Sequence, residues 1–123
     1  MSQYGIVIVS HVPEIASGIK RLIEQVASNV CVTIAGGIED NDIGTSIEKI
    51  NHAMEANSAS ELLAFYDLGS AKMNLELCSE LTEKEIHLFN VPIVEGAYSA
   101  AALAEVGISI EEISKQLQDI IIK

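Results

Sequence analysis

The chain has 123 residues, of which 49% are hydrophobic, so it is long enough to enclose one core and short for two. Asp and Glu total 18 against 7 Lys and Arg, and a surface with a formal net charge of -11 repels nucleic acid and anionic lipid. The sequence shows no secretory leader pattern and no apolar run long enough to cross a bilayer. We expect a single domain, residues 1–123, in the cytoplasm, with neither nucleic acid nor membrane as a partner.

A continuous apolar run at residues 4–9 is typical of a buried strand. Pro13 follows it, and proline is common at the first position of helices. Apolar positions then recur at intervals of three and four residues, which predicts a helix with one apolar side. That side consists of Ile15, Ile19, Leu22, Ile23 and Val26.

A second apolar run, at residues 31–35, ends at Gly36-Gly37 and predicts the second strand. Thr45 and Glu48 then have the spacing of a capping box, in which two side chains satisfy backbone N–H groups at a helix start. The apolar stripe of the helix that they predict consists of Ile47, Ile50 and Met54.

A third run, at residues 62–66, ends at Asp67, and a turn at Gly69-Ser70 leads into a helix. The apolar positions on one side of that helix are Met73, Leu77 and Leu81. A fourth strand is predicted at residues 86–90, with Pro92 just beyond its end.

Two short helices are predicted in the remaining chain. One is alanine-rich and follows Gly96, and the other begins at Ser109 with Glu112 in a capping box. The inward positions of the second helix are Ile110, Ile113, Leu117 and Ile120.

Two cysteines, Cys31 and Cys78, lie far apart and within apolar segments. They form no C-x-x-C pair, and buried thiols of this kind are typical of a reducing compartment. We expect both to be core residues.

Strands and helices alternate along the chain, an order that predicts parallel strands joined by helices. Because the strands are apolar on both sides, helices must cover both faces of the sheet. The expected fold is therefore α/β: a doubly wound, mainly parallel four-stranded sheet with helices on both faces. Ligands of such sheets bind beyond the carboxyl ends of the strands.

Four loops follow the carboxyl ends of the predicted strands: residues 10–13, 36–40, 67–70 and 94–96. They bring the imidazole of His11, a carboxylate and several glycines to one rim of the sheet. None of the four contains Lys or Arg, which argues against tight binding of a nucleoside triphosphate. A transient phosphoryl group fits this rim better.

An imidazole is largely neutral at pH 7, and its lone pair can attack phosphorus without an activating base. The carboxylate of Asp67 can hold the opposite ring nitrogen of His11 and fix its tautomer. Backbone N–H groups at helix starts, together with hydroxyl groups, can bind the phosphate oxygens. The candidate phosphate-binding residues are Gly37, Thr45, Gly69 and Ser70.

Each of these residues also has a purely structural interpretation. A lone histidine in such a loop is more often a hydrogen-bonded structural residue, and Asp67 before a helix is a common cap. The glycines make tight turns, and Thr45 with Glu48 caps a helix without any ligand. His52 lies off its apolar stripe and His87 falls within a strand, so neither is assigned a role. No zinc spacing, dinucleotide fingerprint or P-loop is present, and no metal site is predicted.

The segment GIVIVSHVPE, residues 5–14, resembles the start of the mannose-type EIIA domains of the bacterial phosphotransferase system. The phosphorylated histidine of those domains follows the first strand, a position that His11 matches. More narrowly, residues 35–46, 66–71 and 90–97 resemble the DhaM family, the phosphotransfer subunits of dihydroxyacetone kinase. The likeness covers essentially the whole chain, and the loop AGGIEDNDIGTS at 35–46 is its best discriminator from sugar-transporter EIIA domains.

The resemblance implies that His11 accepts phosphate from the phosphocarrier HPr and passes it to ADP held by a partner subunit, DhaL. The chain itself then has no tightly bound cofactor, and dihydroxyacetone on a third subunit, DhaK, is the final acceptor. Some DhaM proteins carry fused HPr-like and enzyme-I-like domains, and we expect this chain to rely on separate proteins for those steps. A homodimer is also implied, with the alanine-rich helix and residues 120–122 as candidate contacts. Val12 and Ile38 are candidates for partner docking near His11.

Three alternatives stay open. A mannose-type sugar-transporter EIIA domain uses the same chemistry on His11 but passes phosphate to a IIB domain. A receiver-like signalling domain is suggested by Asp67 at the end of a third strand, although Ser10-His11 stands where receivers have paired acids. A non-catalytic regulatory domain with the same fold is the third.

Overall fold

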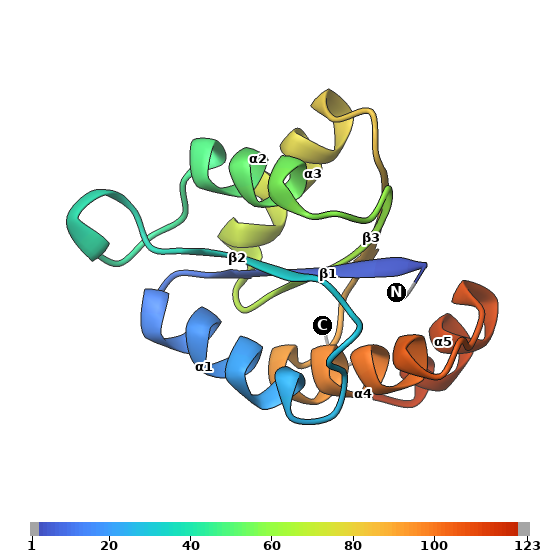
Figure 1. Ribbon diagram of the computed structural model, residues 1–123. Coiled ribbons are helices and arrows are strands. Elements are labelled where there is room, and N and C mark those ends of the chain that lie inside the picture. Colours follow the sequence, from blue (N-terminus) through green and yellow to red (C-terminus); the bar gives the residue numbers. More distant parts are fainter. Residues whose placement is uncertain (1–2, 121–123) are drawn as a thin grey trace.

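The computed structural model describes residues 3–120, which form four parallel strands side by side in the order β2-β1-β3-β4 (Figure 1). The strands are β1 (Tyr4–Ser10), β2 (Val32–Gly36), β3 (Glu61–Tyr66) and β4 (Glu85–Phe89). Each predicted strand is confirmed to within one residue at either end, and the sheet is parallel throughout.

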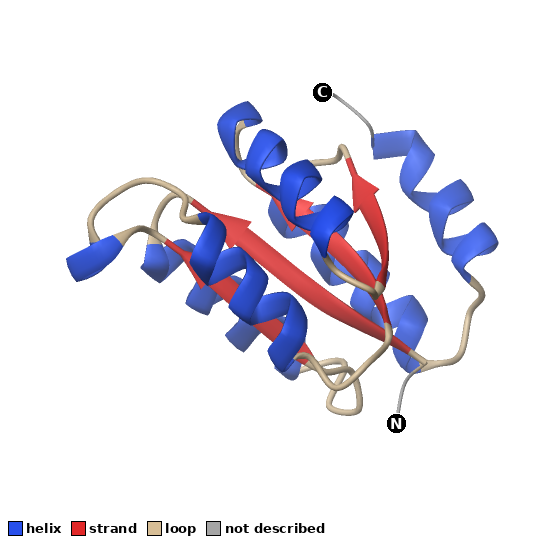
Figure 2. Ribbon diagram, turned by 90° about the horizontal axis from the view of Figure 1, so that it is seen from above, coloured by secondary structure: helices blue, strands red, loops and turns tan. Residues whose placement is uncertain are grey.

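The helices cover both faces of the sheet (Figures 1 and 2). One face carries α1 (Pro13–Glu24), α4 (Ile93–Glu105) and α5 (Ile110–Leu117), and the other carries α2 (Ile47–Ala56) and α3 (Gly69–Leu81). Two short 3₁₀ segments, Glu39–Asn41 and Gln118–Ile120, complete the described elements. This is the doubly wound α/β fold that was predicted. Within residues 3–120, no helix combines the length and apolarity that crossing a membrane requires.

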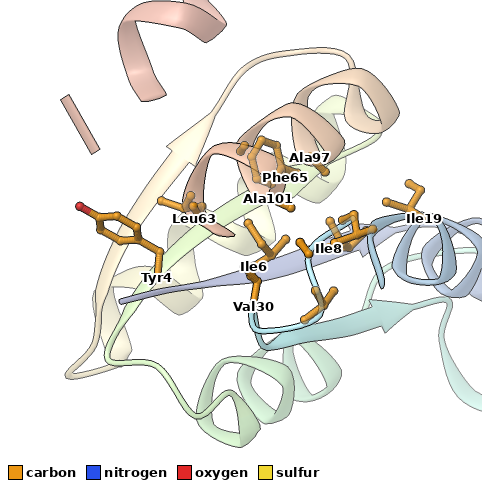
Figure 3. Packing of buried hydrophobic residues seen from close by; sticks show 14 of the residues in the cluster. Tyr4, Ile6, Ile8, Ile19, Val30, Leu63, Phe65, Ala97 and Ala101 are labelled. Carbon is orange, nitrogen blue, oxygen red and sulfur yellow. The ribbon is translucent and has the colours of Figure 1, made fainter. Parts of the chain in front are cut away.

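Strand β1 lies between β2 and β3, and all seven of its residues are buried. Its side chains alternate: Ile6 and Ile8 pack toward α1 and α4, whereas Val7 and Val9 pack toward α2 and α3. Figure 3 shows the first of these two clusters, where Phe65 of β3 projects toward α4. Burial on both faces explains why the strand appears in the sequence as an unbroken apolar run.

The side of α3 that faces the core differs from the prediction. Met73, Leu77 and Leu81 do share one side, but it faces solvent, with 70%, 45% and 66% of these residues exposed. The buried side consists of Ala71, Leu75 and Cys78. Small residues at two of these three positions allow the helix to lie close to the sheet.

The predicted stripes of α1 and α2 are only partly buried. On α1, Ile19 and Ile23 are buried together with Ala16, whereas Ile15 and Leu22 are partly exposed. Val26, also predicted on this stripe, lies beyond the end of α1 and is partly exposed. On α2, Ile50 and Met54 are buried and Ile47 is exposed. In both helices a predicted apolar position thus lies at or beyond the margin of the core.

The N-cap of α2 is Ser46, one residue later than predicted. Its hydroxyl accepts a hydrogen bond from the Lys49 N–H at 3.2 Å. The predicted capping box of Thr45 and Glu48 is therefore wrong, because capping depends on which residue leaves the helical backbone conformation. The cap at Ser109 of α5 is confirmed, with the Glu112 N–H donating to its hydroxyl at 3.3 Å.

Helix α4 begins at Ile93, before the predicted start, so residues 94–96 form its first turn and are not a loop. Gly96 donates its N–H to the Pro92 carbonyl at 2.8 Å. A Cβ at Gly96 would overlap the Val91 side chain, so this glycine marks close packing instead of a turn. The alanines of α4 at 97, 100, 101 and 104 are buried in the chain's own core, so this helix stays a predicted dimer contact only through its other residues.

The two thiols differ in burial. Cys78 is buried in α3, and burial raises the pKa of its thiol. Cys31, just before β2, is only partly buried, and its Sγ accepts a hydrogen bond from the Ser58 N–H at 3.5 Å. The expectation of two core thiols therefore holds for Cys78 alone.

Replacing Gly5 by Ala is expected to destabilise the fold by about 2–4 kcal/mol, because a Cβ there would overlap the buried side-chain amide of Asn57. That amide donates to the Ile6 and Cys31 carbonyls, both at 3.1 Å, so moving it leaves buried polar groups unpaired. Urea unfolding measures the difference. The matched control is Gly18→Ala on the exposed side of α1, where no atom lies within 4 Å of the new Cβ. A urea-unfolding midpoint of Gly5→Ala equal to that of the wild type would contradict the prediction, because it would mean that the Asn57 side chain moves aside at no cost in free energy.

Candidate active site

The strand order places two loops beside each other at the carboxyl edge of the sheet. The chain passes from β1 to β2 on one side of β1, and β3 then pairs with β1 on the other side. At such a switch point the loops after the two adjacent strands diverge and leave room for a ligand. Val9 of β1 is in register with Tyr66 of β3, so the residues that follow, Ser10-His11 and Asp67, emerge level with each other.

The ring of His11 is held between Asp67 and Ser70. Its Nδ1 lies 2.9 Å from Oδ1 of Asp67, and its Nε2 lies 2.6 Å from Oγ of Ser70. A carboxylate accepts hydrogen bonds only, so Nδ1 carries the proton and Nε2 carries the lone pair. The side chain is 16% exposed, so the ring lies at the rim with its lone pair directed at the Ser70 hydroxyl. All three of these residues were predicted from the sequence.

Asp67 is the centre of the hydrogen-bond network. Its Oδ1 also accepts the Leu68 N–H at 2.7 Å, and its Oδ2 accepts the His11 N–H and the Ser10 hydroxyl, each at 2.9 Å. Burial alone would raise the pKa of this carboxyl, but the hydrogen bonds from His11, Ser10 and Leu68 outweigh burial and lower it. The group therefore stays ionised and keeps the ring of His11 oriented.

Stability is expected to depend on the charge of Asp67 in acid. Because its pKa is lowered on folding, the ionised carboxylate stabilises the fold above the unfolded pKa, about 3.9, and this contribution is lost as the pH falls through the folded pKa. The advantage of the wild type over Asp67→Asn at pH 5 should then shrink as the pH falls below about 4. Denaturant unfolding of both proteins across this range measures it. A difference in unfolding free energy between the two proteins that is the same at pH 3 and pH 5 would contradict the lowered pKa of Asp67.

Ser10 is a site residue that the sequence analysis did not single out. It is fully buried at the end of β1, where its hydroxyl donates to Asp67 at 2.9 Å and accepts the Val12 N–H at 3.1 Å. These two bonds join the backbone turn that carries His11 to the carboxylate that orients its ring. The sequence carries one signal for this role: Ser10 is a polar residue that ends an otherwise apolar run, directly before the histidine.

The first turn of α3 is the best-placed anion-binding element. Gly69 and Ser70 are its first two residues, and the preceding Leu68 supplies no side-chain cap. N–H groups at these positions take no part in the helix's own hydrogen-bond ladder and lie at the positive end of its dipole. Since the Ser70 hydroxyl contacts Nε2 of His11, this turn is next to the position that a transferred group would occupy.

The other two candidate phosphate-binding residues have different contacts. Gly37, at φ +71°, donates its N–H to the Ser10 carbonyl at 3.1 Å. Thr45 accepts a hydrogen bond from the Asn74 side chain of α3 at 2.7 Å. The loop that carries both residues is also tied to the site by the Gly44 N–H, which donates to the His11 carbonyl at 2.9 Å. Gly37 and Thr45 thus shape the wall of the site, since these hydrogen bonds join them to Ser10 and Asn74 and not to the His11 ring.

A lysine outside the four loops also stabilises this wall. The ammonium group of Lys49, on α2, donates to the carbonyls of Gly36 and Ile38 at 3.1 and 3.0 Å. Lys49 was not predicted as a site residue because it lies one helical turn beyond the loop. Its charge neutralises carbonyl dipoles and holds the loop in shape.

The apolar side chains at the rim differ in exposure. Val12 and Ile38, predicted to dock a partner, are only partly exposed. Two more exposed side chains flank the same loops: Leu68 at 59% and Ile43 at 73%. The apolar rim is therefore broader than the sequence analysis indicated.

Comparisons with known proteins place the chain in a family. The family model described as the PTS system fructose IIA component, EIIA-man, matches residues 5–114. The chain is 56% identical over 120 residues to the PTS-dependent dihydroxyacetone kinase phosphotransferase subunit DhaM of Lactococcus lactis subsp. lactis, and the match covers 98% of both chains. It is 49% identical to the phosphoryl donor subunit DhaM of the PEP-dependent dihydroxyacetone kinase 1 of Listeria innocua, with 98% of this chain and 97% of the relative covered.

Solved structures agree on the fold. A crystal structure of a protein of unknown function superposes with a TM-score of 0.86 at 33% identity, covering 100% of this chain and 98% of the other. A sigma-54 interaction domain protein from Enterococcus faecalis superposes with a TM-score of 0.71 at 15% identity, covering 95% and 89%, and supports the fold alone. The chain belongs to the mannose-type EIIA family of the phosphotransferase system and, within it, to the group of DhaM subunits.

Proposed function

We propose that this chain is the phosphoryl relay subunit of a dihydroxyacetone kinase and that Nε2 of His11 carries the phosphoryl group. One observation carries the proposal: Nδ1 is bound to the Asp67 carboxylate, so the lone pair is on Nε2 at the rim, beside the Ser70 hydroxyl. The names of the Lactococcus and Listeria relatives support the same assignment.

The geometry suits transfer without any proton movement on His11. The Nε2 lone pair attacks the phosphorus of a donor phosphohistidine, the donor's P–N bond breaks, and its electrons return to the donor ring. The ring of His11 becomes cationic while Nδ1 keeps its proton, and the Asp67 carboxylate at 2.9 Å stabilises that charge. In the second transfer an acceptor oxygen attacks phosphorus, the P–N bond breaks, and the ring returns to its neutral form.

Ser70 has two roles in this scheme. Before transfer its hydroxyl donates to Nε2 and holds the ring in place at 2.6 Å. When phosphorus approaches Nε2, the hydroxyl rotates and donates to a phosphoryl oxygen, joined by the N–H groups of Gly69 and Ser70. We therefore assign phosphate binding to the first turn of α3.

The donor that we propose is the phosphocarrier HPr, and the acceptor is ADP bound to the DhaL subunit. The nucleotide then stays with the partner, in keeping with loops that lack Lys and Arg around His11. We place the reaction in the cytoplasm, where these partners are expected, and we propose that the chain works as a homodimer. Of the predicted dimer contacts at the end of the chain, Ile120 is partly buried, and residues 121–122 lie outside the described residues.

A receiver-like mechanism would need the Asp67 carboxylate as phosphoacceptor. Both of its oxygens already accept hydrogen bonds, from Ser10, Leu68 and both N–H groups of His11. An attack on phosphorus would break this network, whereas attack by Nε2 leaves it intact. The geometry therefore favours the histidine.

Incubation with phosphoenolpyruvate, enzyme I and HPr tests the proposal. We expect the chain to gain one phosphoryl group by mass, labile in acid and stable in base, and to lose it when DhaL with ADP is added. Discharge to a IIB domain but not to DhaL with ADP would favour the sugar-transporter alternative. No mass gain, or a base-labile acyl phosphate, would refute the relay on His11.

A further inference from the structure

Three side chains that can bind metal lie together at the amino-terminal ends of β3 and β4. His11 lies at the other end of the sheet, beyond the carboxyl ends of the strands. Glu61 begins β3, Glu85 begins β4, and His87 lies two residues further along β4. Glu61 and Glu85 are direct register partners, and His87 is paired with Leu63. Because side chains alternate along a strand, all three project from the same face of the sheet.

The donor atoms of these residues converge. Nε2 of His87 lies 2.8 Å from Oε2 of Glu61 and 3.1 Å from Oε2 of Glu85. One donor atom from each residue lies within 4.8 Å of the other two, and residues 3–120 contain no second group of this kind. We propose that Glu61, Glu85 and His87 bind a divalent transition-metal cation such as Zn²⁺.

The spacing is close to that of a tetrahedral site. With Zn–N and Zn–O distances near 2.1 Å, two ligand atoms of a tetrahedron are about 3.4 Å apart. The two contacts of His87 Nε2, at 2.8 and 3.1 Å, need to open by about 0.6 and 0.3 Å to admit the ion. The glutamate side chains have the rotatable bonds to allow this.

The charge arrangement favours a cation between the strands. Two carboxylates directly opposite each other on neighbouring strands repel and destabilise the pairing. A neutral imidazole offers a single N–H to the pair, whereas a divalent cation neutralises both charges. Because β4 pairs only with β3 among the described strands, such an ion would fasten the edge of the sheet.

The mixed donor set and its exposure indicate which cations fit. One imidazole nitrogen with two carboxylate oxygens suits zinc and its neighbours, whereas Mg²⁺ and Ca²⁺ prefer ligand sets made only of oxygen. The side chains of Glu61, His87 and Glu85 are 19%, 26% and 67% exposed, so a cation has access from solvent and water can complete its coordination. Sequence spacing predicted no metal site, because the ligands come from two strands and form no local motif.

Calorimetric titration of the chelator-treated full chain with ZnCl₂ tests this site independently of phosphoryl transfer. We expect one equivalent to bind to these residues, weakened at least about tenfold in His87→Ala and in Glu61→Gln. The matched control is His52→Ala, which removes an exposed imidazole on α2 and should bind zinc as the wild type does. The His11→Gln variant, which removes the imidazole that faces Asp67, should also bind as the wild type does. MgCl₂ should give no heat of binding at the same concentration.

Thermal unfolding supplies a second measurement and a folding control. Zinc should raise the unfolding midpoint of the wild type and of His52→Ala, but not of His87→Ala or Glu61→Gln. The unfolding midpoints without metal show whether each variant is folded. If His87→Ala is not folded, Glu61→Gln still tests the site, because it keeps the size of the side chain. Equal zinc affinity in His87→Ala, Glu61→Gln and the wild type, or loss of binding only in His11→Gln, would overturn the proposal.

Discussion

The His11→Asn variant is expected to take up no phosphoryl group from phosphoenolpyruvate, enzyme I and HPr. Asparagine keeps an N–H near the position of Nδ1 and can still donate to Asp67, but it has no lone pair that attacks phosphorus. Removing the nucleophile of a covalent mechanism lowers the rate by a factor on the order of 10⁶, which is below detection here. Intact-mass measurement over the time in which the wild type is fully phosphorylated gives the result.

Two further variants test whether this result is specific to the ring of His11. His52→Asn makes the same replacement at an exposed position of α2 and should be phosphorylated at the wild-type rate. His11→Gln places an amide nearer the position of Nε2 and should be as inactive as His11→Asn, with a cooperative thermal unfolding transition that shows it is folded. Phosphorylation of the folded His11→Asn protein would mean that another residue is the acceptor, and the proposed relay would then be wrong.

The strand positions were predictable because β1 and β3 are buried on both faces, which leaves continuous apolar runs in the sequence. Once the strands were placed, the rule that ligands bind beyond their carboxyl ends was enough to select His11 and Asp67. Their contact at 2.9 Å was not predictable in itself, since it depends on β3 pairing with β1 and not with β2.

The inward side of α3 was not predictable from its large apolar residues. Periodicity finds a stripe, but Met73, Leu77 and Leu81 form an exposed one, and the buried one includes Ala71 and Cys78. Where a helix lies close to a sheet, small residues occupy the contact, and they carry a weak hydrophobic signal. For the same reason Gly96 looked like a turn, although it packs against Val91 inside α4.

Some residues of the candidate site were predictable from the sequence and others were not. Ser70 was predictable because a hydroxyl in the first turn of α3 has few places to point other than the rim. Ser10 was not, because its role depends on the turn of backbone that brings its hydroxyl to within 2.9 Å of Asp67. Gly37 and Thr45 were predicted from their positions in the sequence, but Gly37 donates to the Ser10 carbonyl and Thr45 accepts from the Asn74 side chain.

Replacing Asp67 by Asn is expected to slow phosphoryl uptake by about 10²–10⁴-fold while leaving His11 in place. An amide has one accepting oxygen, whereas the carboxylate accepts four hydrogen bonds. If the amide oxygen faces Nδ1, the NH₂ group opposes the Ser10 hydroxyl and the His11 N–H. If the amide is reversed, its NH₂ group donates to Nδ1, and the ring proton moves to Nε2, which removes the attacking lone pair.

Rates of phosphorylation by phospho-HPr, measured by quenched mass spectrometry, give the size of this effect. The matched control is Asp40→Asn, an exposed position at φ 57°, a conformation that asparagine tolerates well; its rate should equal the wild type's. Thermal unfolding separates loss of fold from loss of the oriented ring. A folded Asp67→Asn protein that is phosphorylated within a few-fold of the wild-type rate would show that Ser70 and the backbone orient His11 without the carboxylate. Slow uptake combined with an intact fold would instead assign the orientation of the ring, and the stabilisation of its positive charge, to Asp67.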